Sequence, residues 1–251
     1  MAKGWRNTAS ILRHDSIVGR AARLPLRAVA ARYRGRAVRI LSGPCRGMRW
    51  IIGEGIHGYW LGTHERRAMH RFAPYVRPGG CFVDVGAHCG YWTLWGSRRA
   101  GPTGLVVAIE PLPENVRTLN QHRALNALML QTQTVHGAAG ATDGGSVRLA
   151  RPTTTDEAHI VAEGEPGILV PAVTVDAIAS LGGLRPTAVK IDVEGAELDV
   201  LRGMELVCAR YHPAIHLSAH GDEIRSAVPG ALAQLGYASV VEYAPNDFIA
   251  T

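Results

Sequence analysis

The sequence predicts an α/β fold in which helices cover both faces of a mostly parallel central sheet. Three short apolar segments lead to this prediction, and each is followed by a turn and then by residues with helical spacing. They are residues 81–85 (CFVDV), 105–109 (LVVAI) and 188–193 (AVKIDV). Segments of this kind are typical of strands in a parallel sheet, because helices bury such a sheet on both sides. An N-terminal extension made of helices and a hairpin is expected to precede the sheet.

The N-terminal part of the chain differs from the rest in charge. Residues 1–40 contain ten Lys and Arg and one acid, Asp15, whereas the remaining residues contain 17 basic and 20 acidic side chains. The net charge of +6 therefore comes from the extension. A nucleic-acid enzyme would need its basic surface around the active site, so we expect no nucleic-acid partner. Residues 1–34 have the spacing of Arg-rich amphipathic helices, which are expected to pack on the domain or to act as a lid. An interfacial membrane helix is less favoured, because the apolar face is thin and rich in alanine.

We expect the extension to end at residue 57 and the main domain to comprise residues 58–251. No apolar run is long enough to span a bilayer, and no secretory signal is recognisable, so a cytoplasmic protein is expected. The four cysteines form no CxxC pair. This usage indicates reduced, buried thiols and argues against a structural zinc site.

The remaining elements follow in order from turn signals and periodicity. Further strands are expected at residues 36–41, 46–52, 132–136, 146–149, 170–175 and 213–219. Helices are expected at residues 65–76, 91–98, 114–128, 176–182 and 196–204, and residues 231–241 should form a last helix and a closing strand. Residues 138–145 read as a loop of small residues, and residues 150–168 as a longer loop that could close over an acceptor.

The turn after residues 81–85 gives the first indication of a ligand. Asp84 lies inside the apolar run, and Gly86 and Gly90 bracket the turn in a D-x-G-x-x-x-G pattern. Glycines allow the backbone to approach a ligand closely, and a buried carboxylate needs a partner. A dinucleotide site would show G-x-G-x-x-G, so an NAD-dependent oxidoreductase is disfavoured. The acid suits a cationic ligand without phosphate, such as S-adenosylmethionine (SAM), whose amino group and sulfonium are both positive.

Acidic residues also follow the other two strands. Glu110 ends the second strand, where a carboxylate can accept hydrogen bonds from both hydroxyls of a ribose. In the third segment the alternation of a strand would place Lys190, Asp192 and Glu194 on one face. Such a row must pair within itself, as a Lys190–Asp192 ion pair would, or with a ligand. Ligands bind at the carboxyl ends of strands in open α/β sheets, where these residues lie.

Three segments resemble the FkbM family of SAM-dependent methyltransferases: VDVGAHCGYWTL, AIEPLPENVRTLNQHRALN and VTVDAIASLGGLRPTAVKIDVEGAELDVLRG. The resemblance extends over roughly residues 58–220. It implies a class I Rossmann-like methyltransferase fold and methyl transfer from SAM, with S-adenosylhomocysteine as product. It also implies O-methylation of a hydroxyl on a small-molecule natural product or a saccharide.

The resemblance further implies roles for individual residues. The methionine end of SAM would contact Asp84, Gly86, Ala87, His88 and Gly90. The ribose would be held by Glu110, with Asn115 nearby, and the adenine would lie against Ala138 and Ala139. Asp192 and Glu194 would face the methyl group and the acceptor. Two positions depart from the family pattern. Gly140-Ala141-Thr142 separates the two alanines from Asp143, whereas the family usually has an acid soon after them, and Ser218 stands where a glutamate is common.

Methyl transfer from a sulfonium is an in-line displacement in which positioning supplies much of the catalysis. A hydroxyl acceptor also needs a base, and the candidates are Asp192 and His220, with Glu194 orienting the acceptor. A divalent metal held by Asp192, Glu194 and a third oxygen ligand would acidify the hydroxyl as well, but no metal is predicted. N-methylation of an amine or peptide, and a non-catalytic SAM-fold module that serves a partner protein, are the competing functions.

Overall fold

The structure is a computed structural model that describes residues 28–150, 161 and 165–251. The helices expected within residues 1–34 fall largely outside this range, although residues 28–33 are helical. Most of the loop expected at residues 150–168 also lies outside it. Within the described parts of the chain, no helix combines the length and the apolar character that a membrane crossing requires.

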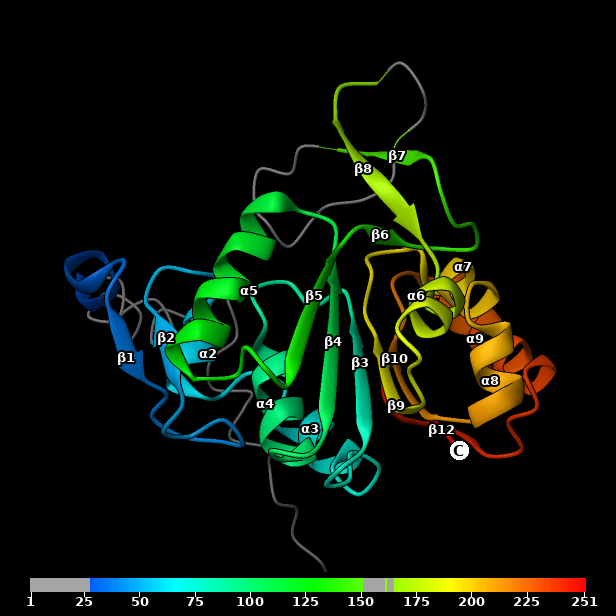
Figure 1. The fold of residues 1–251 in the computed structure, drawn as a ribbon, viewed down its shortest axis with the longest axis horizontal. Coiled ribbons are helices and arrows are strands. Elements are labelled where there is room, and N and C mark those ends of the chain that lie inside the picture. Colours follow the sequence, from blue (N-terminus) through cyan, green and yellow to red (C-terminus); the bar gives the residue numbers. More distant parts are fainter. Residues whose placement is uncertain (1–27, 151–160, 162–164) are drawn as a thin grey trace, which may run out of the picture.

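A seven-stranded sheet forms the centre of the fold, in the order β11-β12-β10-β9-β3-β4-β5 (Figure 1). Its strands are β3 (Cys81–Val85), β4 (Leu105–Glu110), β5 (Thr132–His136), β9 (Pro186–Ile191), β10 (Ala214–Ser218), β11 (Val240–Ala244) and β12 (Asp247–Ala250). Neighbouring strands from β10 to β5 run parallel, whereas β12 is antiparallel to both β10 and β11. The predicted mostly parallel sheet is therefore confirmed.

Helices cover both faces of this sheet, as predicted. One face carries α2 (His57–Leu61), α3 (Arg66–Phe72), α4 (Tyr91–Ala100) and α5 (Pro113–Leu125), and the other carries α6 (Val175–Leu181), α7 (Glu197–Arg202), α8 (Glu205–Tyr211) and α9 (Asp222–Gln234). Side chains alternate along β3, so Phe82 packs with α3 and α4, whereas Val83 and Val85 pack with α6 to α9. Both sides of β3 are buried, which explains its unbroken apolar run.

Two smaller sheets flank the centre. Strands β1 (Ala37–Arg39) and β2 (Arg49–Ile51) form the antiparallel hairpin that the Ser42-Gly43-Pro44 turn predicts. Trp50 on β2 is completely buried and stacks on His122 of α5 with ring centroids 3.8 Å apart. Strands β6 (Ala138–Ala139), β8 (Ile168–Val173) and β7 (Ser146–Leu149) form the second, in that order. Residues 138–139, predicted as loop, pair with β8 in parallel.

The strand predicted to run from residue 188 through Glu194 is too long, because β9 ends at Ile191. The amide of Asp192 still donates to the carbonyl oxygen of Val85 (3.2 Å). The backbone then turns away through Glu194 (φ 53°) and Gly195 (φ 107°), both left-handed, and enters α7. Asp192 and Glu194 therefore lie in a turn beyond the strand, and the period-two rule does not apply to them.

The predicted helix boundaries also need correction near the C-terminus. Helix α9 begins at Asp222 rather than at Ala231, and it continues through Pro229. This proline removes one backbone hydrogen bond, which the buried contacts of Val228 and Leu232 offset. The short helices α2 and α8 were not predicted at all. Each buries only two side chains, so neither leaves a full amphipathic pattern in the sequence.

Candidate functional site

The carboxyl ends of β3, β4, β9 and β10 border a cavity of about 510 Å³. One side, the β4 wall, consists of Gly86, His88, Glu110, Asn115, Ala138 and Ala139. The opposite side, the β9 wall, consists of Asp192, Glu194 and His220. The structure thus brings nine of the predicted site residues to one cavity. Asp84, Ala87 and Gly90 do not line it, although Ala87 and Gly90 belong to the turn that does.

Gly86 allows the turn after β3 to pack directly against the end of β9. Its φ is +73°, and a Cβ at this position would lie only 1.8 Å from the carbonyl oxygen of Asp192. The amides of Gly86 and Ala87 both donate to the carbonyl oxygen of Ile109, each at 3.0 Å, which fixes the turn to β4. Only a glycine fits here, because a side chain would clash with Asp192 and would disfavour the positive φ. The backbone of Gly86 therefore faces the cavity without a side chain.

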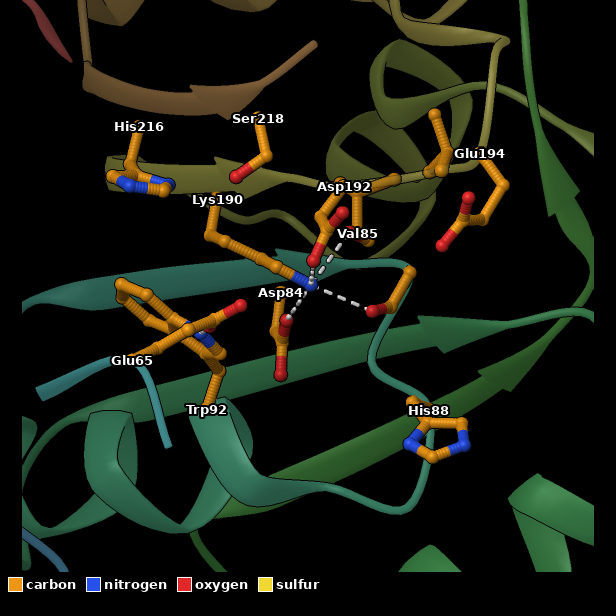
Figure 2. A network of polar contacts seen from close by, with 12 residues as sticks. Glu65, Asp84, Val85, His88, Trp92, Lys190, Asp192, Glu194, His216 and Ser218 are labelled. Carbon is orange, nitrogen blue, oxygen red and sulfur yellow. Dashed lines mark hydrogen bonds and ion pairs between the residues drawn. The ribbon is translucent and has the colours of Figure 1, made fainter. Parts of the chain in front are cut away.

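Lys190 is the centre of a buried polar network under this turn (Figure 2). Its ammonium lies 3.3 Å from Asp84 Oδ1 and 3.5 Å from Asp192 Oδ2, and it donates to the carbonyl oxygen of Gly86 (2.6 Å). Thr93 Oγ1 donates to the other oxygen of Asp84 (2.6 Å). The Lys190–Asp192 pair that the sequence suggested is present, and Asp84 is part of it.

The charges in this network stabilise one another. Burial acts to lower the pKa of Lys190, but the carboxylates of Asp84, Asp192 and Glu65 outweigh it and raise the pKa to about 12. Burial raises the pKa of Asp84, whereas the Lys190 ammonium and the Thr93 hydroxyl favour its ionised form. With Lys190 charged, the fully buried Asp84 is held as its counter-ion and does not reach the cavity.

Glu110 presents a fixed carboxylate on the β4 wall. Its Oε1 accepts hydrogen bonds from Leu112 N and Asn115 Nδ2, both at 3.0 Å, and its Oε2 accepts one from His88 N at 2.8 Å. Burial raises the pKa of Glu110, while these hydrogen bonds favour the ionised form. Each carboxylate oxygen can accept more than one hydrogen bond, so Oε2 keeps a free acceptor site.

The β9 wall is a cluster of charged groups around one imidazole. His220 Nε2 lies 3.6 Å from Asp192 Oδ1 and 3.4 Å from Glu194 Oε2. On its other side, His220 Nδ1 donates to Glu197 Oε1 at 2.7 Å. The hydrogen bond to Glu197 is the main reason that the pKa of His220 rises to about 9; burial opposes it, and the nearby carboxylates add to it. His220 is therefore an imidazolium at neutral pH.

Glu197 holds the β9 wall together, and sequence reasoning did not single it out. The side chain is fully buried, and Oε1 also accepts from the amides of Gly195 (3.2 Å) and Val193 (3.4 Å). It lies in the KIDVEGAE segment, in the first turn of α7. An acid at an inward position of a short helix is an available signal, because burying it requires partners.

Further side chains from the N-terminal half line the cavity, among them Tyr59, His64 and Glu65. Glu65 Oε2 accepts from Trp92 Nε1, and its Oε1 lies 3.2 Å from His64 Nε2. Burial opposes ionisation of Glu65, but the contacts with His64 and Trp92 lower its pKa to about 2. The lining of the cavity therefore includes an ionised carboxylate that the sequence did not identify.

The sheet order, with one antiparallel strand next to the edge, and the cavity at the strand ends define a class I SAM-dependent methyltransferase fold. The family profile described as a methyltransferase FkbM domain matches residues 84–238. The chain belongs to the FkbM family of SAM-dependent methyltransferases, as its sequence segments predicted.

A solved structure agrees with this fold. The crystal structure of methyltransferase FkbM from Methylobacillus flagellatus KT is 19% identical over 77% of this chain and 52% of that chain, with a TM-score of 0.51. This chain thus spans about half the length of that protein. A precorrin-6y C5,15-methyltransferase from Geobacter metallireducens GS-15 is 16% identical over 75% of this chain and 86% of that chain, with a TM-score of 0.47. No curated protein sequence matches the chain.

Proposed function

We propose that this protein transfers the methyl group of SAM to a hydroxyl of a small-molecule natural product or a saccharide. The observation that supports this proposal is the pairing of two unlike walls across one cavity. The β4 wall offers a hydrogen-bonded carboxylate and small side chains, and the β9 wall offers carboxylates beside a charged imidazole. A volume of about 510 Å³ falls within the usual range of small-molecule pockets, roughly 300–1,000 Å³.

On this proposal the β4 wall holds the cofactor. Glu110 Oε2 accepts a ribose hydroxyl, with Asn115 fixing the carboxylate, and Ala138 and Ala139 leave room for the flat adenine. Gly86 and His88 contact the methionine end through the turn. Asp84, Ala87 and Gly90 act indirectly, since they shape that turn without lining the cavity.

The β9 wall would receive the acceptor. His220 is protonated at neutral pH, so the geometry favours Asp192 as the group that takes the proton of the acceptor hydroxyl. Glu194, whose side chain is partly exposed, orients the acceptor. The hydroxyl oxygen then attacks the methyl carbon. The new C–O bond forms as the C–S bond breaks, the electron pair of that bond goes to sulfur, and S-adenosylhomocysteine leaves.

The test uses deuterated-methyl SAM and a panel of hydroxylated acceptors, with amines of matched size as the comparison. Product mass and the chemical shift of the new methyl group distinguish an O-methyl from an N-methyl product. We expect transfer to hydroxyls only. Transfer to amines alone would replace the proposal by N-methylation, in which a base matters less.

A calorimetric titration with S-adenosylhomocysteine separates the remaining outcomes. We expect saturable binding by the wild-type protein. Binding without transfer to any acceptor of either panel would favour the non-catalytic module. An absence of binding would contradict the cofactor assignment for the β4 wall.

A further inference from the structure

We propose that Asp192, Glu194 and His220 form a binding site for a divalent transition-metal ion at the acceptor end of the cavity. The site itself stands on the geometry of the β9 wall. The role of the ion in methyl transfer rests on the proposed function.

The ligand atoms already have the spacing of a coordination shell. One atom from each of the three side chains lies within 4.8 Å of the other two. His220 Nε2 is 3.4 Å from Glu194 Oε2 and 3.6 Å from Asp192 Oδ1. Ligands about 2.0–2.2 Å from a tetrahedral ion stand about 3.3–3.6 Å apart, whereas a good charged hydrogen bond would be about 2.7–2.9 Å. Both distances from His220 Nε2 therefore fit a pair of ligands on a common ion and are longer than a good charged hydrogen bond.

Glu197 supplies an independent observation. It accepts a hydrogen bond from His220 Nδ1 at 2.7 Å and thereby turns Nε2 toward the two carboxylates. A carboxylate on the far nitrogen of a metal-binding histidine is a common arrangement, because it fixes the ring and raises the basicity of the ligating nitrogen. Glu197 is fully buried, and its Oε2 accepts no hydrogen bond from any described residue. A buried carboxylate with an unpaired oxygen is costly unless positive charge lies nearby.

The acidic side chains of the β9 wall also favour a bound cation. Asp192, Glu194 and Glu197 surround one imidazole ring, and the other oxygen of Asp192 faces Lys190 at 3.5 Å. Lys190 also pairs with Asp84, whose Oδ1 lies 3.3 Å from its ammonium. A divalent ion beside His220 Nε2 would place positive charge next to these three acids.

The ligand set also indicates the kind of ion. Two carboxylates favour Mg²⁺, Ca²⁺ or Mn²⁺, and one imidazole favours transition metals, so Mn²⁺ and Zn²⁺ satisfy both preferences. Three protein ligands leave positions open toward the cavity. An acceptor hydroxyl bound there would become more acidic, and its proton would pass to a carboxylate oxygen that is not bound to the ion.

The first measurement is a titration of the full-length, metal-stripped protein with MnCl₂, followed by the electron paramagnetic resonance signal of the free ion. We expect one saturable site, with affinity weakened at least about tenfold by His220→Ala or Asp192→Asn. Glu197→Gln should weaken it by about 10- to 100-fold, as changes beside a metal-binding histidine do. Electron spin-echo spectra of the bound ion should show coupling to a histidine nitrogen that disappears in His220→Ala.

Asp199→Asn is the matched control, because Asp199 lines the same cavity but pairs with Arg202 outside the cluster. It should bind Mn²⁺ as the wild type does. Equal affinity in the wild type, His220→Ala and Asp192→Asn would overturn the site, and so would a bound ion without nitrogen coupling. Thermal unfolding of each variant checks that lost binding does not reflect an unfolded chain.

Activity tests the role of the ion separately. Transfer that is abolished by metal removal and restored by Mn²⁺ supports it, and equal transfer with and without the ion overturns it while leaving the site intact. S-adenosylhomocysteine binding by the metal-stripped protein shows whether a loss of transfer comes from the ion or from failure of the cofactor site.

Discussion

The two walls of the cavity differ in how their carboxylates are held. Glu110 on the β4 wall is 4% exposed and receives three hydrogen bonds from neutral groups. Asp192 and Glu194 on the β9 wall have side chains 25% and 44% exposed. Both pair with His220, and Asp192 also pairs with Lys190. The first arrangement is rigid and suits a ligand that never varies. The second is open to solvent and can change its charge when a substrate or an ion arrives.

Lys190 connects the two walls. It donates to the Gly86 carbonyl at the β4 side and pairs with Asp192 at the β9 side. The difference between the walls therefore separates two kinds of effect. Changes in the β4 wall should alter cofactor affinity, and changes in the β9 wall should alter turnover. Changes at Lys190 should lower the stability of both walls.

Replacing Asp192 by asparagine should have the largest effect. The variant keeps the shape of the side chain but loses the group proposed to accept the proton, so kcat should fall by about 10²–10⁴-fold. Steady-state kinetics with an acceptor found in the panel measures this change. The affinity for S-adenosylhomocysteine should stay close to that of the wild type, and a parallel loss of that affinity would contradict the division between the walls.

Replacing Lys190 by methionine should destabilise the fold. The variant leaves the Asp84 carboxylate buried without its counter-ion, which typically costs about 3–5 kcal/mol in the free energy of unfolding. Urea unfolding measures the loss, and the double variant Lys190→Met/Asp84→Asn should recover part of it. Arg202→Met removes an exposed cation from its pair with Asp199 and should cost less than about 1 kcal/mol. Similar losses in the two single variants would refute the role of Lys190.

The sequence predicted the sheet and the β4 wall better than the β9 wall. Strands such as residues 132–136 and 146–149 were predicted at their observed boundaries, because their turns and apolar patterns are local. Glu110 and the glycine turn follow from their positions at strand ends, which any parallel sheet brings together. These features depend on topology, and topology is readable from the pattern of strands and helices.

The β9 wall depends on contacts between distant residues. Residues 192–195 continue an alternating pattern, yet the chain leaves the strand there, since Gly86 packs against the carbonyl of Asp192. Likewise, His220 has an ordinary sequence context, and only its hydrogen bond to Glu197 reveals that it is charged. No local pattern contains that information, so the sequence could propose His220 as a base but could not give its protonation state.

A buried neutral histidine lies near each wall, and both should make the fold sensitive to acid. Burial lowers the pKa of His122, which bonds to the Cys89 carbonyl, and of His216, which bonds to Tyr243, to about 4 from 6.5. Between pH 6.5 and about 4 these histidines bind protons in the unfolded chain but not in the native protein. Their contribution to the free energy of unfolding is therefore fully present above pH 6.5 and is lost as the pH falls toward 4. The expected loss is up to about 3 kcal/mol for each histidine.

Urea unfolding across this pH range measures that loss. His216→Gln should flatten the pH dependence, since a neutral amide does not titrate. A variant whose stability falls with pH as steeply as that of the wild type would rule out His216 as a source of the acid sensitivity.

The smallest effect is expected for Glu110→Gln, and it sharpens the comparison most directly. The amide keeps the size of the side chain but replaces one acceptor oxygen by a donor, which conflicts with the donors at Leu112 N, Asn115 Nδ2 and His88 N. A lost hydrogen bond to a charged group is worth about 1.5–3 kcal/mol, so S-adenosylhomocysteine should bind about 10- to 100-fold more weakly. Calorimetry measures this change.

Glu114→Gln is the control, because Glu114 is exposed at the start of α5. This variant should bind S-adenosylhomocysteine like the wild type. If kcat at saturating SAM also fell by orders of magnitude in Glu110→Gln, the β4 wall would act in the chemical step, and the separation between a rigid binding wall and an adaptable reacting wall would be wrong.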